Sequence, residues 1–427
     1  MKKVKPRYHL DQPDTDIYVG DNRKILPQLN ESGFDLIFAD PPFNWQVNYD
    51  KWRDNMPRQE YLHFTYHWLD ECIRVLAPHG SLWVNIPDDT AAEIVIHLKN
   101  RGLTMINWCI WHFRFGQCRN TNFIVSKVHV LYFAKDPKNR IWNAEEILEP
   151  SDRATTYADR RTRNTRTPGM RAPLDVWYGP FWGRIQGANL ERRNSHQNQI
   201  PEAYLERVIR ACSNEGDLVL DPFLGSGTTC TVARALKRRS IGIEYSDAHA
   251  QSAFQRIKNG PIRLENPEDR AIKKAFFATH HGLGVDEVLC DDELLAAFNN
   301  ACRQELPNWS EFNCNYQLWN LYKNGKLNSV RRRYSSDNTR QKENILRLAE
   351  QVKRIRKNSP IERILCDPKL RKNFDKKILA LFPKSDLRLA RKAALSWRKK
   401  ISHHTQVTNK FAHQQYLFDA TELSDEG

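Results

Sequence analysis

Short, nearly continuous apolar segments recur along roughly the first 260 residues, and charged or turn-forming residues bound each of them. Runs of this kind, without polar alternation, are typical of strands buried on both faces of a parallel sheet. The pattern predicts strands within residues 16–24, 34–40, 81–87, 104–113, 126–136, 217–223 and 240–245.

Between these strands, apolar residues recur at the spacing of an amphipathic helix. Strands that alternate with helices indicate an α/β fold with a doubly wound sheet. The predicted helices lie at 58–80, where Pro78 to Gly80 form a stop signal, and at 90–102, 200–216 and 228–239.

This alternation stops between residues 139 and 195, where a polar, arginine-rich stretch gives way to one rich in aromatic residues and glycine. We therefore predict a first domain over 1–262 that carries 139–195 as an inserted segment. Only helical patterns follow. Those at 291–306 and 315–327 predict a small helical domain over 263–335 with a helix-turn-helix character.

The charge of the chain is unevenly distributed, with a formal net charge of +15. Residues 321–427 hold 26 Lys and Arg against 11 Asp and Glu, whereas residues 1–320 hold 40 of each. The last region, 336–427, contains basic amphipathic helical patterns at 343–359 and 386–401, followed by a polar tail that we expect to be disordered. Such a surplus suits a polyanion, most simply nucleic acid, with a merely solubilising tail as the alternative.

The rest of the composition narrows the class of protein. Hydrophobic residues make up 40% of the chain, yet no apolar run approaches the roughly 18 residues of a membrane span. The start, MKKVKPRYHL, lacks the apolar core of a signal peptide, and the nine cysteines form no C-x-x-C pair. These features predict a cytoplasmic, nucleoid-associated protein with reduced thiols and no metal site.

The segment VLDPFLGSGTT, residues 219–229, places Asp221 at the end of a predicted strand and Gly225 and Gly227 in the turn before a helix. Glycine lets the backbone approach a ligand closely, and a helix N-terminus favours an anionic group. Glu244 ends the next predicted strand, about 20 residues on, where an acid holds ribose hydroxyls in a Rossmann-type sheet. The spacing therefore predicts a nucleotide-type ligand.

The segment DPPF, Asp40 to Phe43, follows another predicted strand. An extruded nucleobase needs a hydrogen-bond acceptor for its exocyclic amine and a flat surface for stacking. Asp40 and the Pro41 carbonyl can accept, Phe43 can stack, and the two prolines hold the backbone rigidly. Hydrogen bonds to the amine protons would help its lone pair attack a methyl donor.

Together, DPPF and DPFLGSGTT resemble the DNA amino-methyltransferases that use S-adenosylmethionine, and their order along the chain resembles the permuted β class. GDNRKIL at 20–26 and HQNQIPEAYLERVI at 196–209 extend the resemblance over about 10–260. Ile200 stands where relatives usually carry lysine, so we do not count on a cofactor carboxylate contact there. The resemblance implies a Rossmann-like methyltransferase sheet in circularly permuted order. It also implies that the enzyme flips its target base out of the duplex, and that it belongs to a restriction-modification system.

The resemblance also implies a role for each matching residue. Asp40, Pro41, Pro42 and Phe43 would be catalytic and hold the base. Glu244 would bind the donor ribose and Asp21 its adenine. The methionine and sulfonium part would contact Asp221, Pro222, Phe223, Gly225, Ser226, Gly227 and Thr228.

An aspartate that opens this motif favours adenine as the target, although most adenine enzymes carry tyrosine where this chain has Phe43. Two alternatives with the same chemistry are the N4 amine of cytosine and an RNA substrate. A third, of a different class, is a DNA-binding protein without catalysis.

In the terms of the same family, 139–195 is the target-recognition segment. We expect Arg161, Arg163, Arg166 and Arg171 to contact duplex DNA, because guanidinium groups suit phosphates and guanine edges. The basic C-terminal helices would add a salt-dependent grip on the duplex. Many β-class relatives pair, which makes a homodimer an expectation. Gln414 to Phe418, QQYLF, resembles the short peptide that docks on the replication sliding clamp.

Overall fold

The computed structural model describes most of the chain. The described residues are 4–30, 32–47, 50–52, 54–113, 120–155, 159, 161, 167, 170–179, 183, 185, 187, 189–193, 196, 198–327, 360–381, 383 and 386–395. Two compact units divide the chain, one formed by 1–148 with 172–264 and the other by 149–171 with 265–427.

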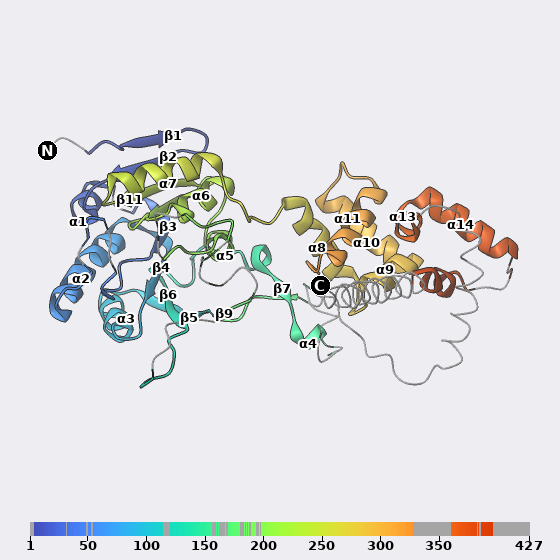
Figure 1. The fold of residues 1–427 in the computed structure, drawn as a ribbon, viewed down its shortest axis with the longest axis horizontal. Helices are drawn as coiled ribbons and strands as arrows, with labels where there is room; N and C mark the ends of the chain where they lie inside the picture. Colours follow the sequence, from blue (N-terminus) through green and yellow to red (C-terminus); the bar gives the residue numbers. More distant parts are fainter. Residues whose placement is uncertain are drawn as a thin grey trace, which may run out of the picture. The chain divides into compact units, whose positions relative to one another are not determined.

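The first unit is built on a nine-stranded sheet with the order β1-β2-β11-β10-β3-β4-β6-β5-β9 (Figure 1). All seven segments predicted to contain strands do so. The strands are β1 Tyr8–Leu10, β2 Thr15–Val19, β3 Phe34–Ala39, β4 Leu76–Ile86, β5 Thr104–His112, β6 Lys127–Ala134, β9 Val176–Trp177, β10 Leu218–Asp221 and β11 Arg239–Glu244.

The centre of this sheet is parallel. Strand β10 pairs with β3 in the register Val219 to Leu36, and with β11 on its other side. Strand β3 also pairs in parallel with β4, whereas β6 runs antiparallel between β4 and β5. The α/β sheet in permuted order is thus confirmed, because the strand that ends in DPPF precedes its neighbour that ends in DPF.

Helices cover both faces, as a doubly wound sheet requires. Helices α1 Asn22–Ile25, α2 Arg58–Val75 and α3 Ala91–Asn100 pack on one face around the buried Trp68. Helices α5 Glu202–Cys212 and α6 Thr228–Ala235 pack on the other, and α7 Asp247–Asn259 packs beside them over Ile17.

The expected end of the helix at Pro78 to Gly80 is wrong. Helix α2 ends at Val75, and β4 starts at Leu76 and contains Pro78. The buried Leu76 pairs with Phe34 of β3, so sheet pairing begins before the sequence stop signal acts. Tertiary pairing overrides the local signal here.

The predicted insertion, 139–195, is divided between the two units, with 149–171 in the second and 172–195 in the first. Residues 149–171 contribute the short β7 Glu149–Pro150, α4 Asp152–Thr155 and β8 Met170–Arg171. Met170 packs against the helical core of the second unit. Sequence alone had assigned the whole segment to the first domain.

The second unit is a helical bundle around one buried core. The helices of its described part include α8 Pro267–Thr279, α9 Val285–Cys290, α10 Asp292–Glu305, α11 Glu311–Lys323, α13 Ile361–Cys366 and α14 Pro368–Leu381. Residues 387–395 are also helical. Ile361 and Ile378 lie in the same core as Phe298, so the expected separation of 263–335 from 336–427 does not follow the packing.

Several sequence predictions lie outside the described residues, among them the basic pattern at 343–359, the polar tail and the peptide Gln414 to Phe418. Eight of the cysteines are described, and all eight are buried free thiols. Among the described helices, none combines the length and apolar content that crossing a bilayer demands.

Candidate functional site

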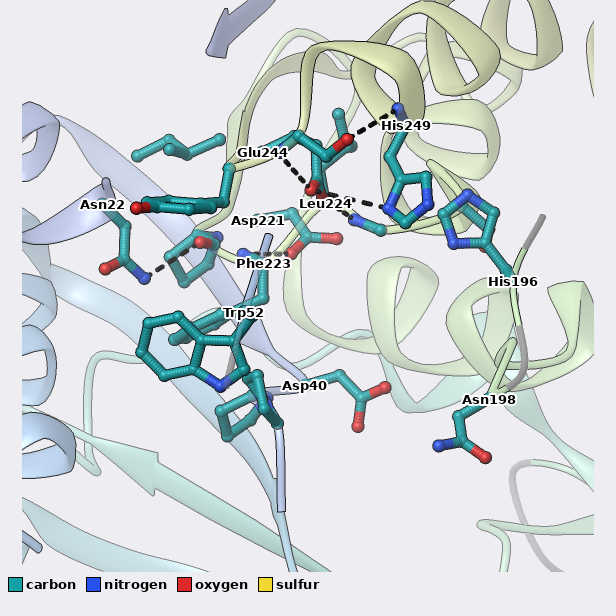
Figure 2. Close-up of a pocket in the computed structure, with 18 of the residues that line it drawn as sticks. Asn22, Asp40, Trp52, His196, Asn198, Asp221, Phe223, Leu224, Glu244 and His249 are labelled. Carbon is teal, nitrogen blue, oxygen red and sulfur yellow. Dashed lines mark hydrogen bonds and ion pairs between the residues drawn. The ribbon is translucent and has the colours of Figure 1, made fainter. Parts of the chain in front are cut away.

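A cavity of about 320 Å³ opens at the carboxyl ends of β3, β10 and β11. Both predicted motifs line it, DPPF from β3 and DPFLGS from β10, together with Glu244 from the end of β11 (Figure 2). Ligands of open α/β sheets bind in such crevices, outside the carboxyl ends of parallel strands. The structure therefore brings together two segments that lie about 180 residues apart in the chain.

The glycine turn after β10 is held by the Glu244 side chain and by close packing against α7. Gly225 has a φ of 49° and its N–H donates to Glu244 Oε2 over 2.9 Å. Gly227 has a φ of 77° and does not line the cavity. A Cβ at Gly227 would lie 2.9 Å from the Cβ of Ala253 in α7, so glycine is required there for close helix packing.

Two buried carboxyl groups face the cavity. Burial raises the pKa of Glu244 to about 7, against the opposing hydrogen bonds from the backbone N–H groups of Ser246 and Gly225. Burial likewise raises the pKa of Asp221 to about 6. Among the described residues, neither acid forms an ion pair with a lysine or an arginine, which suits a ligand that brings positive charge and hydroxyl donors of its own.

The carboxylate of Asp40 is oriented by a short chain of hydrogen bonds. Asn85 Nδ2 donates to Asp40 Oδ1 over 3.0 Å, and the Tyr204 hydroxyl donates to Asn85 Oδ1 over 2.6 Å. Asn85 and Tyr204 are fully buried, whereas Asp40 is half-buried at the cavity wall. Burial, reinforced by the Asp40 charge, raises the pKa of Tyr204, so its hydroxyl remains a donor.

The proline pair and the loop behind it are also fixed. The Tyr61 hydroxyl donates to the Pro42 carbonyl over 2.8 Å. The buried Asp54 carboxylate accepts from the backbone N–H groups of Asn44, Trp45 and Val47 over 2.9 to 3.1 Å. Asp54 was not among the residues predicted to be functional, because an aspartate in a polar loop belongs to no motif.

An aromatic corner closes one side of the cavity. The Trp52 ring lies 4.8 Å from Phe64 and 6.2 Å from Tyr245 between centroids, and Phe223 packs on Phe64. Flat apolar surfaces of this kind suit a purine ring.

Asp21 lies at the same cavity, but its carboxylate already binds Arg23 through two guanidinium nitrogens. Burial opposes ionisation of Asp21, yet the hydrogen bonds from Arg23 outweigh it and lower the pKa of the acid.

Two histidines that the sequence analysis did not single out also line the cavity. The rings of His196 and His249 lie 4.5 Å apart, and His249 Nδ1 lies 3.9 Å from Glu244 Oε1 (Figure 2). His196 Nε2 is buried, with no hydrogen-bond partner among the described residues. Burial, followed by the neighbouring His249, lowers the pKa of His196 to about 3, which leaves a neutral polar group for a ligand to pair with.

A buried ion pair ties the floor of the cavity to the helices. Arg256 Nη2 of α7 binds Glu202 Oε1 of α5 over 2.9 Å, with both side chains almost fully buried. Arg256 Nη1 also donates to Thr228 Oγ1 over 2.7 Å and to Ser226 Oγ. Ser226 and Thr228 line the cavity, so the pair positions the turn that surrounds any ligand.

The arginines predicted to contact DNA are only partly described. Arg161 binds Asp159 over 2.9 Å, and Arg171 binds Asp152 over 3.0 Å and Glu149 over 3.3 Å. Arg163 and Arg166 lie outside the described residues. The two described arginines therefore have acidic neighbours that a phosphate would have to displace.

Comparison with known proteins places these residues in a family. The sequence profile of the DNA methylase family, which covers N6 and N4 methyltransferases, matches residues 34–255. The type II methyltransferase M.HpaI of Haemophilus parainfluenzae is 34% identical over 235 residues, which cover 55% of this chain and 71% of that protein. The DNA adenine methyltransferase YhdJ of Escherichia coli is 33% identical over 250 residues, covering 56% and 81%. The M1.HpyAVI–SAM complex aligns with a TM-score of 0.39 at 21% identity, over 56% of this chain and 98% of that one.

We expect Glu244→Gln to stabilise the ligand-free protein at pH 8 but not at pH 5. The folded-state pKa of Glu244 lies above its ordinary value of 4.5, so the folded protein holds a proton that the unfolded chain releases between about pH 4.5 and 7. This carboxyl group therefore lowers stability as pH rises through that window. Gln carries no charge, but it leaves one of the two backbone N–H donors of Gly225 and Ser246 without its acceptor at both pH values. The expected gain at pH 8 relative to pH 5 is about 1–2 kcal/mol. Urea unfolding at both pH values measures it, and an equal effect at both would contradict the raised pKa of Glu244.

Proposed function

This chain belongs to the DNA methylase family of N6 and N4 methyltransferases, and on that premise we propose that it methylates the exocyclic amine of an adenine at a specific site in duplex DNA. One observation supports this most directly. DPPF and the glycine turn line one cavity, on neighbouring parallel strands. A base held by the first would meet a donor held by the second.

S-adenosylmethionine supplies an activated methyl group on a sulfonium ion. The described residues suit it, since the donor brings positive charge, ribose hydroxyls and a purine. We assign Glu244 to the ribose hydroxyls and Asp221, with the Gly225 turn, to the cationic methionine part. The aromatic corner of Trp52 and Tyr245 suits the adenine ring.

Asp40 and the Pro41 carbonyl would accept hydrogen bonds from the two protons of the target amine, and Phe43 would stack on the base. The amine nitrogen gains positive charge as its new bond to carbon forms and then loses one proton. A carboxylate beside it stabilises that charge and favours loss of the proton. Asn85, held by Tyr204, would donate a hydrogen bond to one Asp40 oxygen, which leaves the other oxygen to face the amine.

The choice of adenine rests on the resemblance of Asp40 to the opening aspartate of adenine enzymes. The family includes N4-cytosine enzymes, and Phe43 departs from the usual tyrosine. A homodimer and a clamp contact through Gln414 to Phe418 stay predictions from the sequence.

Methylation of genomic DNA by the purified protein tests the function. After digestion to nucleosides, we expect N6-methyladenine by mass spectrometry, only when S-adenosylmethionine and DNA are both present. N4-methylcytosine in its place would contradict the base assignment alone. No methylated nucleoside on any DNA would contradict the function.

We expect Asp40→Asn to lower kcat by about 100-fold or more, because the charged acceptor beside the amine is lost. S-adenosylhomocysteine affinity, measured by calorimetry, should stay within about threefold of wild type. Asp35→Asn is the matched control, because Asp35 lies on the same strand but binds His79 and the Leu218 N–H away from the cavity. A wild-type kcat for Asp40→Asn would rule out the assigned role.

Tyr204→Phe should lower kcat about 3- to 10-fold at unchanged donor affinity, because Asn85 loses the hydroxyl that fixes its amide. Tyr132→Phe is the control. Tyr132 lies on β6 of the same unit, and its hydroxyl is also buried but forms hydrogen bonds with Ser81 and Cys212. Thermal unfolding should show similar destabilisation for the two variants. An equal fall in kcat for both would assign Tyr204 a merely structural role.

A further inference from the structure

The positive charges of the second unit fall into two groups that the sequence does not separate. The pattern at 386–401 was predicted to grip DNA, but its described cations hold the fold together. Arg388 binds Glu287 and Asp291, and Lys392 also binds Glu287. Arg391 is 2% exposed and binds Asp292 and Asp375. These side chains form ion pairs within the second unit, and DNA would have to compete with their acidic partners.

Helix α14 has the opposite arrangement. Lys369, Lys372, Lys376 and Lys377 are exposed. Within the described part of the chain, none of the four side chains forms an ion pair or a hydrogen bond. The acid of this helix, Asp375, turns inward to Arg391 over 2.6 Å and so does not neutralise the exposed face.

Three of these lysines form a row. Lys369, Lys372 and Lys376 follow the spacing of one helix face, and the rise of an α-helix spreads them over roughly 10 Å. One strand of duplex DNA carries a phosphate about every 3.4 Å of its axis, so the row spans about three phosphates. The apolar side of α14 is used elsewhere, because Phe374 and Ile378 are buried in the helical core.

We propose that the α14 lysine row, Lys369, Lys372 and Lys376, binds the phosphate backbone of duplex DNA outside the target site. The proposal rests on the function proposed above, since it assigns DNA as the partner. A lipid surface fits less well, because helices that lie on membranes insert a broad apolar face, whereas α14 buries Phe374 and Ile378 in the protein and exposes Leu379 alone among its described large apolar side chains. Lysine makes point-charge contacts to phosphate without reading bases, so the row adds affinity and register rather than sequence choice.

The test is the salt dependence of DNA binding by the full-length protein. Each phosphate neutralised on duplex DNA contributes about 0.9 to the slope of log K against log salt concentration. The triple variant Lys369→Ala, Lys372→Ala and Lys376→Ala should therefore lower the magnitude of that slope by about 2.7. It should leave S-adenosylhomocysteine affinity unchanged, and its helical circular dichroism should match that of wild type, which shows that the second unit has folded.

The matched control removes three lysines of the same unit that do form ion pairs. Lys273 binds Glu265, Lys274 binds Glu305 and Lys326 binds Asp269. Replacing these three by alanine should change the slope by less than about 0.5. Equal changes in the two triple variants would overturn the proposal, because net charge alone would then explain the binding.

Two further outcomes separate this proposal from the function on which it rests. If wild type methylates no DNA but the α14 variant still shows a smaller salt dependence of DNA binding, the proposed enzymatic function fails and the role of the lysine row stands. If wild type methylates DNA and the variant binds DNA with the wild-type salt dependence, only the proposed role of the lysine row is refuted. Binding of wild type to vesicles of anionic phospholipid, lost in the variant while the DNA slope is kept, would assign the row to lipid and overturn the proposal.

Discussion

The site depends on the parallel pairing of β10 with β3, which sets Val219 beside Leu36 and Leu220 beside Ile37. All four residues are fully buried, so a shift of one residue would move apolar side chains to the wrong face of the sheet. Because the strands are parallel and in this register, Asp40 and Asp221 leave the sheet at the same edge. The cavity between them follows from that pairing.

Buried charged groups of the first unit have two roles. Some form ion pairs that hold the fold together, and others line the cavity. Glu202 and Arg256 neutralise one another in the interior and hold α5, α7 and the glycine turn together. Within the described part of the chain, neither Glu244 nor Asp221 pairs with a lysine or an arginine, and burial raises the pKa of both. The two charges of a buried ion pair neutralise one another. A buried acid at a cavity wall is instead stabilised by a ligand with compensating charge. The same physics therefore makes one group structural and the other available.

The second unit shows that a count of positive charges does not define a surface. Arg391 and Lys372 lie 19 residues apart in a basic region, yet one is buried against two aspartates and the other is exposed. Helical spacing decides which face of α14 each residue occupies, and packing decides which face is covered. If the second unit binds a polyanion, the cations available for it include the exposed lysines of α14, which form no ion pair within the described part of the chain.

The strands, their alternation with helices and both motifs could be read from the sequence, because apolar periodicity and turn residues are local signals. The end of α2 could not, since pairing of Leu76 with Phe34 replaces the local stop at Pro78. Nor could the links from Tyr204 through Asn85 to Asp40 or the contact of His196 with His249, because their members come from distant segments. The Asp54 loop is local, but it matches no motif. Sequence alone determined which chemical groups this protein carries and on which elements. Only the tertiary structure decided which of them meet, because the sheet register and helix packing arise from contacts across the whole chain.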